Sequence, residues 1–563
     1  FSSRRRHTRY SLQSRGLGDV YKRQMQEAVE RIEKAINSEE NILVYGDYDV
    51  DGTTAVSLVA SYLKSYYRNV ATYIPDRYQE GYGVSYQGID FANDNDITLI
   101  IALDCGIKAL DKVSYAKEKG IDFIICDHHR PGEELPDAVA VLDPKREDCN
   151  YPYDELCGCG VGFKMVQALA SRKGQIIDDL VIYLDLVATA IAADIVPITE
   201  ENRILTYYGL EEINTNPRPG IKAIIDQLQK PQLTITDVVF IIAPRINAAG
   251  RIKHGNHAVE LLTSEDLDQA HEFAAAIETY NTNRRDLDKQ ITKEALQQIE
   301  ENNEQSNYTT VVYREDWHKG VIGIVASRLI ETYYRPTLVF TKNGEKLAAS
   351  ARSVSGFDVY NALESCSESI EQFGGHKYAA GLTLLPENYE VFKNKFEQVV
   401  KDSIPKELLS PEIMVDQEIE LTDITAKFYR ILKQFGPFGP QNMKPVFMAK
   451  HVFDTGYART VGSDHSHLKL KITDGEHQFD AIGFGLGKYC EDLKNKQHFD
   501  CVFTVEENVW KVVQVKSAMQ TTIPLVRKNA ENTSDVLVTQ LIRLKHIPAE
   551  DMQQLLSQFV SPG

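Results

Sequence analysis

The chain has 563 residues, a length that predicts three or four domains at about 150 residues per domain. Hydrophobic residues make up 43% of the sequence and charged residues 25%, which excludes a disordered or fibrous protein. The formal charge of −19 argues against a surface that is basic throughout, although a local basic groove is compatible with it.

Two further features of the composition bear on the cellular compartment. The longest apolar stretch, from Leu180 to Ile195, is interrupted by Asp185 and Asp194, so no run of about 18 uncharged apolar residues exists and we expect no membrane span. The eight cysteines include no Cys-x-x-Cys pair, and several lie in apolar runs. Reduced core thiols are therefore expected, which favours a cytoplasmic location.

Residues 1–24 differ from the rest of the chain. They carry seven basic residues and one acidic residue, without hydrophobic periodicity and without the apolar stretch of a secretory signal. The segment resembles a translated sequencing adaptor fused to a truncated reading frame, and we interpret it as non-native; a nucleic-acid-binding arm is the alternative that charge allows. Ordered structure is expected from about Met25, where Ala28, Ile32 and Ala35 fall at helical spacing.

Within residues 25–256, short apolar runs alternate with amphipathic segments. Nearly continuous apolar strands that alternate with helices are typical of a parallel sheet covered on both faces, so an α/β domain is expected, completed by helices over 161–215. The expected strands are 42–45, 97–103, 121–126 and 138–142, and the expected helices include 54–67 and 110–119.

The remaining sequence predicts four further parts. Residues 257–305, rich in Ala, Glu, Leu and Gln, predict a linker of one long helix or two, and residues 306–405 predict a second, smaller α/β domain. Residues 406–525 predict a small β-barrel of short alternating strands, and residues 526–563 predict a helical tail.

One strand of the expected barrel has a basic face. Along 467–472, three apolar side chains alternate with His467, Lys469 and Lys471. This face could contact phosphates, and Phe479 and Trp510 could stack on bases or belong to the core, which is the more common place for an aromatic side chain.

The strongest chemical signal is Gly46-Asp47-Tyr48-Asp49-Val50-Asp51-Gly52, directly after an apolar strand. In extended backbone the three carboxylates would project to one side, about 6–7 Å apart, where a bound cation would offset their repulsion. A calcium-binding EF-hand loop requires Glu at its twelfth position, but residue 58 is Leu, and a strand rather than a helix precedes the motif. An EF-hand is therefore excluded.

Two more expected strands end in the same chemistry. One is followed by Asp104, and the other by Asp127, His128 and His129; Asp194 closes an apolar helix. Because the carboxyl ends of parallel strands lie along one edge of a sheet, these groups are expected to converge. Carboxylates mixed with imidazole, without a cysteine cluster, favour Mn²⁺ or Mg²⁺ over structural zinc. Two such ions about 3.5–4 Å apart activate a water for in-line attack at phosphorus, so phosphoester or phosphoanhydride hydrolysis is expected.

The Asp-His-His motif and these aspartates resemble the DHH phosphoesterase superfamily. Four further motifs carry a closer resemblance: Tyr-Gly-Asp-Tyr-Asp-Val-Asp-Gly-Thr-Thr at 45–54, Ala-Pro-Arg-Ile-Asn-Ala-Ala-Gly-Arg at 243–251, Trp-His-Lys-Gly-Val-Ile-Gly-Ile-Val-Ala-Ser-Arg at 317–328 and Gly-Gly-His-Lys-Tyr-Ala-Ala-Gly at 374–381. With these motifs the chain is similar, within that superfamily, to the RecJ family of bacterial 5′→3′ single-strand-specific DNA exonucleases. The resemblance covers about residues 25–525 and implies a DHH domain, a long linking helix, a DHH-associated domain and an oligonucleotide-binding (OB) barrel, with the active site between the first and associated domains.

With this resemblance, roles can be assigned to the acidic and imidazole residues. Asp47 and His129 are expected to be ligands or to orient ligands. The expected metal ligands are Asp49, Asp51, Asp104, His128 and Asp194, and the catalytic set is the same five residues with His129.

Candidate substrate-binding residues lie in four other stretches. Gly374, Gly375 and His376 combine small residues, which let a nucleic-acid backbone approach closely, with one imidazole; a tight turn is the alternative. Ser350 and Arg352 offer a hydroxyl and a guanidinium suited to a terminal phosphate. The other candidates are Arg77, Arg245 and Arg251, although a single arginine is more often a solvated surface charge.

The expected activity is a 5′→3′ exonuclease that releases 5′-mononucleotides from single-stranded DNA with two Mn²⁺ or Mg²⁺ ions, in DNA repair and recombination. The expected partners are a single-strand-binding protein and a helicase, the protein being a monomer without a membrane partner. A phosphodiesterase or pyrophosphatase acting on small nucleotides is the first alternative, although it would not need the barrel. A non-catalytic scaffold is the second, although every expected ligand position is filled.

Overall fold

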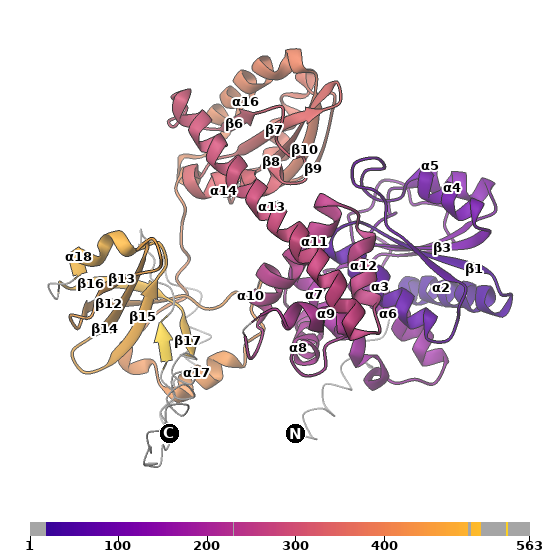
Figure 1. Cartoon of the computed structure of the whole chain (residues 1–563), viewed down its shortest axis with the longest axis horizontal. Coiled ribbons are helices and arrows are strands. Elements are labelled where there is room, and N and C mark those ends of the chain that lie inside the picture. Colours follow the sequence, from indigo (N-terminus) through magenta and orange to yellow (C-terminus); the bar gives the residue numbers. More distant parts are fainter. Residues whose placement is uncertain (1–18, 229, 494–496, 508–535, 539–563) are drawn as a thin grey trace. The chain divides into compact units, whose positions relative to one another are not determined.

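A five-stranded parallel sheet forms from the apolar runs in the first third of the chain (Figure 1). Its strand order is β2-β1-β3-β4-β5, and its side chains enter two separate hydrophobic cores, one on each face. The sequence missed only the short edge strand β2, which is half-buried. The strands are β1 (Asn41–Gly46), β2 (Val70–Tyr73), β3 (Ile97–Leu103), β4 (Asp122–Cys126) and β5 (Ala140–Leu142).

Helices cover both faces of this sheet. In Figure 1, α4 and α5 lie on one face, and α2, α3 and α6 lie on the other. The helices are α2 (Asp19–Asn37), α3 (Val50–Lys64), α4 (Tyr86–Asp94), α5 (Leu110–Glu118), α6 (Gly158–Arg172), η1 (Ile177–Tyr183), α7 (Leu184–Asp194), α8 (Glu200–Thr215), α9 (Pro219–Ile225), α10 (Ile235–Asp237), the π-helical turn η2 (Val238–Ile242) and α11 (Ala243–Ile252). Helix α2 begins at Asp19, earlier than the expected Met25, and Gln24 Oε1 accepts a hydrogen bond of 2.7 Å from the Val141 amide.

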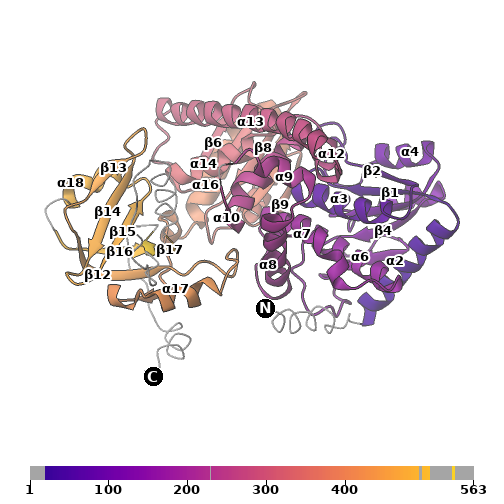
Figure 2. The same ribbon diagram turned by 60° about the horizontal axis from the view of Figure 1, so that its bottom comes forward.

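The linker consists of two helices, α12 (Asn256–Thr263) and α13 (Leu267–Glu301), of which α13 is seen lengthwise in Figure 2. The Asp266 side chain caps α13 by accepting from the Gln269 amide, which explains why the helical pattern is interrupted there.

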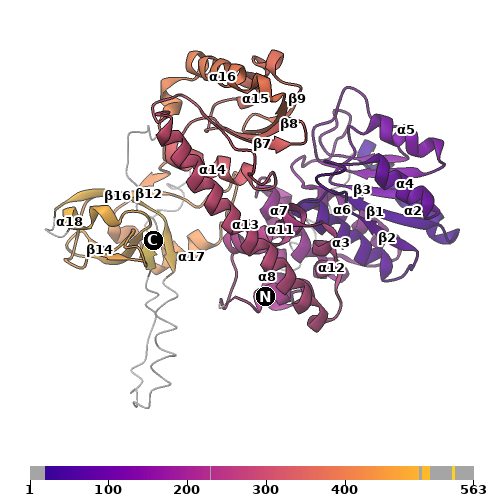
Figure 3. The same ribbon diagram turned by 45° about the horizontal axis from the view of Figure 1, so that its top comes forward.

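A second sheet has the order β6-β7-β8-β10-β9. Helices α13 and α14 pack on one of its faces, and α15 and α16 on the other (Figure 3). The elements are β6 (Thr310–Tyr313), α14 (Ile322–Tyr333), β7 (Thr337–Asn343), β8 (Lys346–Arg352), α15 (Val359–Glu364), β9 (Gln372–His376), β10 (Ala379–Leu384) and α16 (Tyr389–Ser403).

The computed structural model describes residues 19–228, 230–493, 497–507 and 536–538. It divides into two units, the first ending at Ser410 and including Gly439–Gln441, and the second containing 411–438 and the residues from 442 onward. Among these residues no helix is long and apolar enough to cross a bilayer. All eight cysteines are free, and seven are buried, as predicted for core thiols.

The second unit contains paired strands around a separate core. As predicted, Leu468, Leu470 and Ile472 of β14 are buried. Phe479 packs half-buried against this core, whereas Trp510 lies outside the described residues. The elements are β11 (Gln417–Glu418), α17 (Ala426–Lys433), β12 (Phe447–Asp454), β13 (Arg459–Val461), β14 (His467–Thr473), β15 (Gln478–Gly483), α18 (Cys490–Leu493), β16 (Phe499–Phe503), β17 (Val505–Glu507) and β18 (Val536–Val538).

Strand β18 corrects part of the prediction for the C-terminal residues. Val536–Val538 were expected to be helical, but they pair with β15 and β17. The rest of the predicted tail, 526–535 and 539–563, lies outside the described residues.

Candidate metal centre and nucleic-acid interface

Four strands of the parallel sheet are each followed by an aspartate at the carboxyl edge. Asp47 follows β1, Asp104 follows β3 and Asp127 follows β4, as predicted. Asp143 follows β5 and was missed, although the same rule about strand ends would have found it. It is fully buried, its Oδ1 accepts from the Lys145 amide, and burial raises its pKa to about 7.

The first acidic motif does not form one extended stretch, so the prediction that three carboxylates project to one side of an extended backbone is wrong. Asp49 is the N-cap of α3 and accepts a hydrogen bond of 3.1 Å from the Gly52 amide, so Asp51 lies in the first helical turn. Asp47 stays at the strand end, where its Oδ1 accepts from the Gly83 amide.

Four side chains from distant segments converge on one point. His128 Nε2 lies 3.1 Å from Asp104 Oδ1, 3.6 Å from Asp194 Oδ2 and 3.7 Å from Asp51 Oδ2. Among the described residues, two groups have all their ligand atoms within 4.8 Å of one another, and neither contains Asp47 or Asp49. These groups are Asp104-His128-His129 and Asp51-His128-Asp194.

The charges of these groups fit divalent cations. Burial, followed by repulsion from neighbouring carboxylates, raises the pKa of Asp104 and Asp194 well above the usual range and that of Asp51 to about 7. Burial lowers the pKa of His128 to about 3, so its imidazole is neutral and keeps a lone pair. Asp104 Oδ1 and His128 Nε2 are buried, and no hydrogen bond joins either atom to another described group. A cation between these oxygen and nitrogen atoms would satisfy all of them.

The N-terminus of α6 fixes Asp51. The Gly158 amide donates to Asp51 Oδ2 at 2.6 Å, and the Cys159 amide donates to Oδ1 at 2.7 Å. These two bonds and the positive end of the helix dipole favour the charged carboxylate. The sequence did not reveal this arrangement, because Gly158 and Cys159 are far from Asp51 along the chain.

His129 is held differently from His128. Its Nδ1 lies 2.8 Å from Asp127 Oδ1, and its Nε2 lies 3.0 Å from the hydroxyl oxygen of Tyr82. Burial alone would lower the pKa of His129, but the hydrogen bond to Asp127 and the surrounding carboxylates raise it to about 9. The imidazolium therefore carries a proton at Nε2 at neutral pH. Tyr82 was not predicted, since the sequence gives no sign of its contact with His129.

An arginine cluster lies beside Asp49. The guanidinium of Arg77 lies 4.0 Å from the ring centre of Tyr48, and Arg251 Nη1 donates to the Gly320 carbonyl oxygen at 2.8 Å. Arg352 Nη1 donates to Ser350 Oγ at 3.1 Å. Burial and the neighbouring guanidinium groups of Arg77, Arg352 and Arg284 lower the pKa of Arg251 to about 10. Repulsion among these cations makes this a favourable position for an anion.

Two other arginines change the predicted set of substrate-binding residues. Arg245 Nε pairs with Glu278 Oε2 at 2.6 Å and its Nη1 donates to the Ile241 carbonyl oxygen, so a carboxylate of α13 already neutralises it. Arg284, on α13, was missed because only the fold brings this helix beside Arg251.

Gly374, Gly375 and His376 lie on β9, at the edge of the second sheet. A side chain added at Gly374 would meet open space, whereas Gly375 has a φ of +145° and lies against β10. Burial and the positive charges of His129, Lys108 and Lys145 lower the pKa of His376. His376 therefore lies within electrostatic range of His129.

Three family models match the chain. The DHH family, N-terminal domain, matches residues 41–191, the DHHA1 domain matches residues 305–402, and the RecJ OB domain matches residues 415–519. These matches agree with the predicted fold class and with the order of the two sheets and the second unit; closure of the strands of that unit into a barrel stays a prediction.

The chain is also similar to curated proteins and to a solved structure. It is 37% identical to the single-stranded-DNA-specific exonuclease RecJ of Bacillus subtilis over 86% of this chain and 61% of the relative, so it spans less than two thirds of that protein. It is 33% identical to the protein of the same name from Salmonella typhimurium, over 86% and 87% of the two chains. A crystal structure of exonuclease RecJ bound to manganese matches with a TM-score of 0.59 and 29% identity, over 68% of this chain and 95% of that chain.

Proposed function

We propose that this chain, which belongs to the RecJ family, is a single-strand-specific DNA exonuclease that works in the 5′→3′ direction and releases 5′-mononucleotides. The observation that carries the proposal is the convergence of Asp51, Asp104, His128 and Asp194 beside an arginine cluster. The first feature suits hydrolysis of a phosphodiester, and the second suits recognition of a phosphate.

Mn²⁺ or Mg²⁺ would be held by Asp51, Asp104, His128 and Asp194. Asp47 and Asp49, which lie close to Asp51 in the sequence, would complete the set of ligands. Bound there, a pair of ions would supply an activated water and electrostatic stabilisation of the charge that develops on the phosphate. The structure of a RecJ exonuclease bound to manganese supports this choice of metal.

The side chains around the metal centre have separate tasks. The α6 amides hold Asp51 in place, and Asp127 orients His129. The proton at His129 Nε2 is available to the leaving 3′ oxygen, with Tyr82 fixing the ring. His376 would contact the scissile phosphate from the second sheet, where Gly374 leaves room for the strand.

The polarity of cleavage would come from the arginine cluster. Arg77, Arg251 and Arg352, with the Ser350 hydroxyl, would bind a terminal 5′-phosphate, which carries more charge than an internal phosphodiester. Arg245 contributes less because Glu278 neutralises it. The names of the relatives, which specify single-stranded DNA, support the same substrate for this chain.

The wider setting follows from this activity. A helicase produces single strands and a single-strand-binding protein covers them, so these are the partners we propose for a monomeric enzyme acting in the cytoplasm during repair and recombination.

The test compares Asp104→Asn with Asp96→Asn. Both aspartates have a positive φ, 59° and 53°, which Asn tolerates, and they lie at opposite ends of β3. The rate of the Asp104 variant on single-stranded DNA is expected to fall by more than about a hundredfold. Substituting residues that only orient metal ligands already lowers metal affinity or activity by about 10–100-fold. The Asp96 variant is expected to match the parent.

The assay uses 5′- and 3′-labelled single-stranded and duplex DNA with Mn²⁺, Mg²⁺ or a chelator. Release of label from the 5′ end of single strands, abolished by the chelator, is the expected result. Parent activity in Asp104→Asn would refute the site, and activity on duplex ends or from the 3′ end would refute the proposed specificity.

A further inference from the structure

The linker helix α13 carries a row of exposed cations that the proposed reaction does not use. Arg285, Lys289 and Lys293 are spaced by four residues, so they share one face of the helix over about 12 Å. All three are exposed, and none forms an ion pair with another described residue. The chain as a whole carries a net charge of −19, so this row is a local concentration of positive charge.

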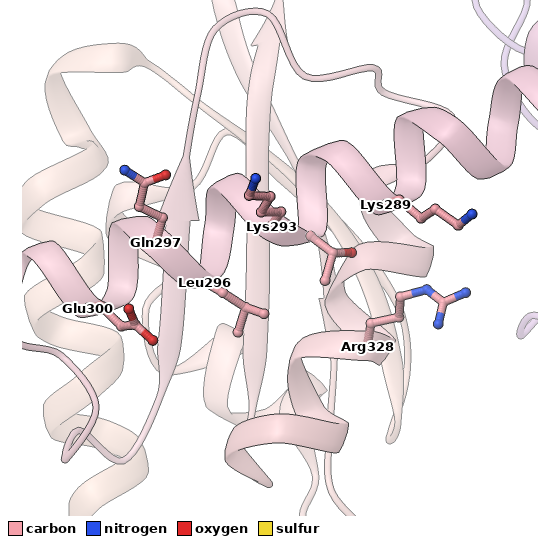
Figure 4. A pocket seen from close by; sticks show the side chains of 7 residues that line it. Lys289, Lys293, Leu296, Gln297, Glu300 and Arg328 are labelled. Carbon is pink, nitrogen blue, oxygen red and sulfur yellow. The ribbon is translucent and has the colours of Figure 1, made fainter. Parts of the chain in front are cut away.

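A surface cavity of about 560 Å³ lies along this row, between α13 and α14. In Figure 4 the side chains of Lys289 and Arg328 extend in the same direction, one from each helix, while Lys293 rises from the next turn of α13 and Leu296 supplies apolar surface. Glu300, one of the cavity's lining residues, lies at the far end.

Arg328 is fixed in position by a buried carboxylate. Its Nε donates to both oxygens of Asp288, at 2.9 and 2.8 Å, and Asp288 is only 1% exposed. Because this contact uses Nε, the two terminal nitrogens stay available at the surface. Asp288 therefore holds the guanidinium beside the cavity and leaves its outer edge to bind another group.

The row is continuous with the arginine cluster of the candidate active site. Arg284 precedes Arg285 on α13, and burial followed by the charges of Arg285, Arg328 and Arg245 lowers its pKa. Arg284 in turn lies among the cations that depress the pKa of Arg251. Positive charge thus extends from the candidate phosphate site along α13 to the cavity.

We propose that Arg285, Lys289, Lys293 and Arg328, the α13 basic face, bind the phosphate backbone of single-stranded DNA outside the active site. A polynucleotide supplies the regularly repeated negative charge that this row matches, and the lysine stems and Leu296 tolerate sugars and bases without reading sequence. The inference rests on the proposed function, because it assigns the face to the same substrate.

The test reverses two charges in Lys289→Glu/Lys293→Glu and measures the Kd for a long labelled oligothymidylate as a function of salt. Lys34→Glu/Lys64→Glu is the matched control, with the same change of charge at exposed positions of α2 and α3. The parent and the two variants are also assayed for hydrolysis of an oligonucleotide that is too short to extend from the active site to the α13 basic face. These lysines are exposed, so neither pair is expected to affect folding.

For the α13 variant we expect a Kd several-fold higher than that of the parent. The magnitude of the salt dependence, d log K/d log[salt], should fall by about 1.4, because each of the two lysines no longer neutralises a phosphate and each such phosphate contributes about 0.7. Hydrolysis of the short oligonucleotide should be unchanged, as should every property of the control. The inference would be overturned if the α13 variant had the Kd and salt slope of the parent. It would also be overturned if the variant lost affinity only for polyglutamate, measured in the same way, because the face would then be assigned to an acidic polypeptide. Absence of hydrolysis in the parent would instead refute the proposed function, whatever the binding shows.

Discussion

At the scale of single residues, the candidate centre depends on backbone positions as much as on its ligands. The strand-end aspartates and His128 could be predicted, because their place follows from the parallel sheet alone. The groups that hold them could not. Gly158 and Tyr82 act through tertiary contacts, and nothing in their local sequence marks them as neighbours of Asp51 or His129.

Gly158 shows how tight this packing is. A Cβ at Gly158 would lie 2.5 Å from the Cβ of Asp104 and 2.7 Å from its Cα, whereas a Cβ at Gly160, two residues along α6, would meet its nearest neighbours at 3.5 Å. Gly158→Ala must therefore displace Asp104 or the amides that hold Asp51, while Gly160→Ala fits without strain.

We expect Gly158→Ala to weaken Mn²⁺ binding by roughly 10–100-fold, the effect of disturbing groups that orient metal ligands. Titration calorimetry with Mn²⁺ alone measures this without relying on activity. Gly160→Ala is the control, and it should bind Mn²⁺ as the parent does and unfold at the same temperature or higher, since alanine favours a helix. Equal Mn²⁺ affinity in the two variants would show that Gly158 does not position the centre.

At the scale of elements, prediction succeeded where burial dictates the sequence pattern. Strands β1, β3, β4 and β5 are apolar because helices cover both faces of the sheet, so their positions could be read directly. The prediction that Asp51 lies in an extended stretch was wrong because of a helix cap. Acidic residues at every second position have the period of a strand, but Asp49 starts a helix, since its side chain accepts a hydrogen bond from the Gly52 amide. The break between α12 and α13 depends on a similar cap, at Asp266.

Helix α7 ends in a conformation that its sequence does not favour. Ile195, the residue after Asp194, has a φ of 59°, and its side chain is 66% exposed. A β-branched residue in this left-handed region costs about 1–2 kcal/mol, a cost that Asn largely avoids. Backbone strain of this kind is often found where a functional site fixes the backbone, and Asp194 is a candidate metal ligand.

Ile195→Asn is therefore expected to raise the free energy of unfolding of the first unit by about 1 kcal/mol, because it relieves strain and gives up little buried surface. Denaturant unfolding with the same change at Ile182 provides the comparison. Ile182 is 50% exposed but has a negative φ, so its replacement should bring no gain. A loss of stability in Ile195→Asn would mean that packing of the isoleucine, rather than its backbone, determines the end of α7.

At the scale of the whole molecule, the candidate metal centre belongs to the first unit alone, whereas cations that could bind a DNA strand lie in both units. The first unit contains every candidate metal ligand, the arginine cluster and the α13 basic face, and it has cores of its own. The second unit has a separate core and the strand β14, whose Lys469 and Lys471 lie on its less buried face. This division could be predicted from the change in sequence pattern near residue 406, although the boundary lies at Ser410.

A chain ending at Ser410 should therefore separate the two properties. We expect it to bind Mn²⁺ and to hydrolyse a short oligonucleotide nearly as the parent does, but to bind a long single strand more weakly and with a smaller salt slope, because the second unit's cations are absent. Removing Gly439–Gln441 also exposes Ile198, whose amide donates to the Pro440 carbonyl oxygen, so a modest loss of stability is expected.

The same truncation carrying Lys289→Glu/Lys293→Glu shows whether the two surfaces act independently. If both bind the strand, their effects on log Kd should add, since they share no side chain. A truncated chain that binds the long strand as tightly as the parent would remove the second unit from the binding surface and leave the first unit to hold the whole substrate.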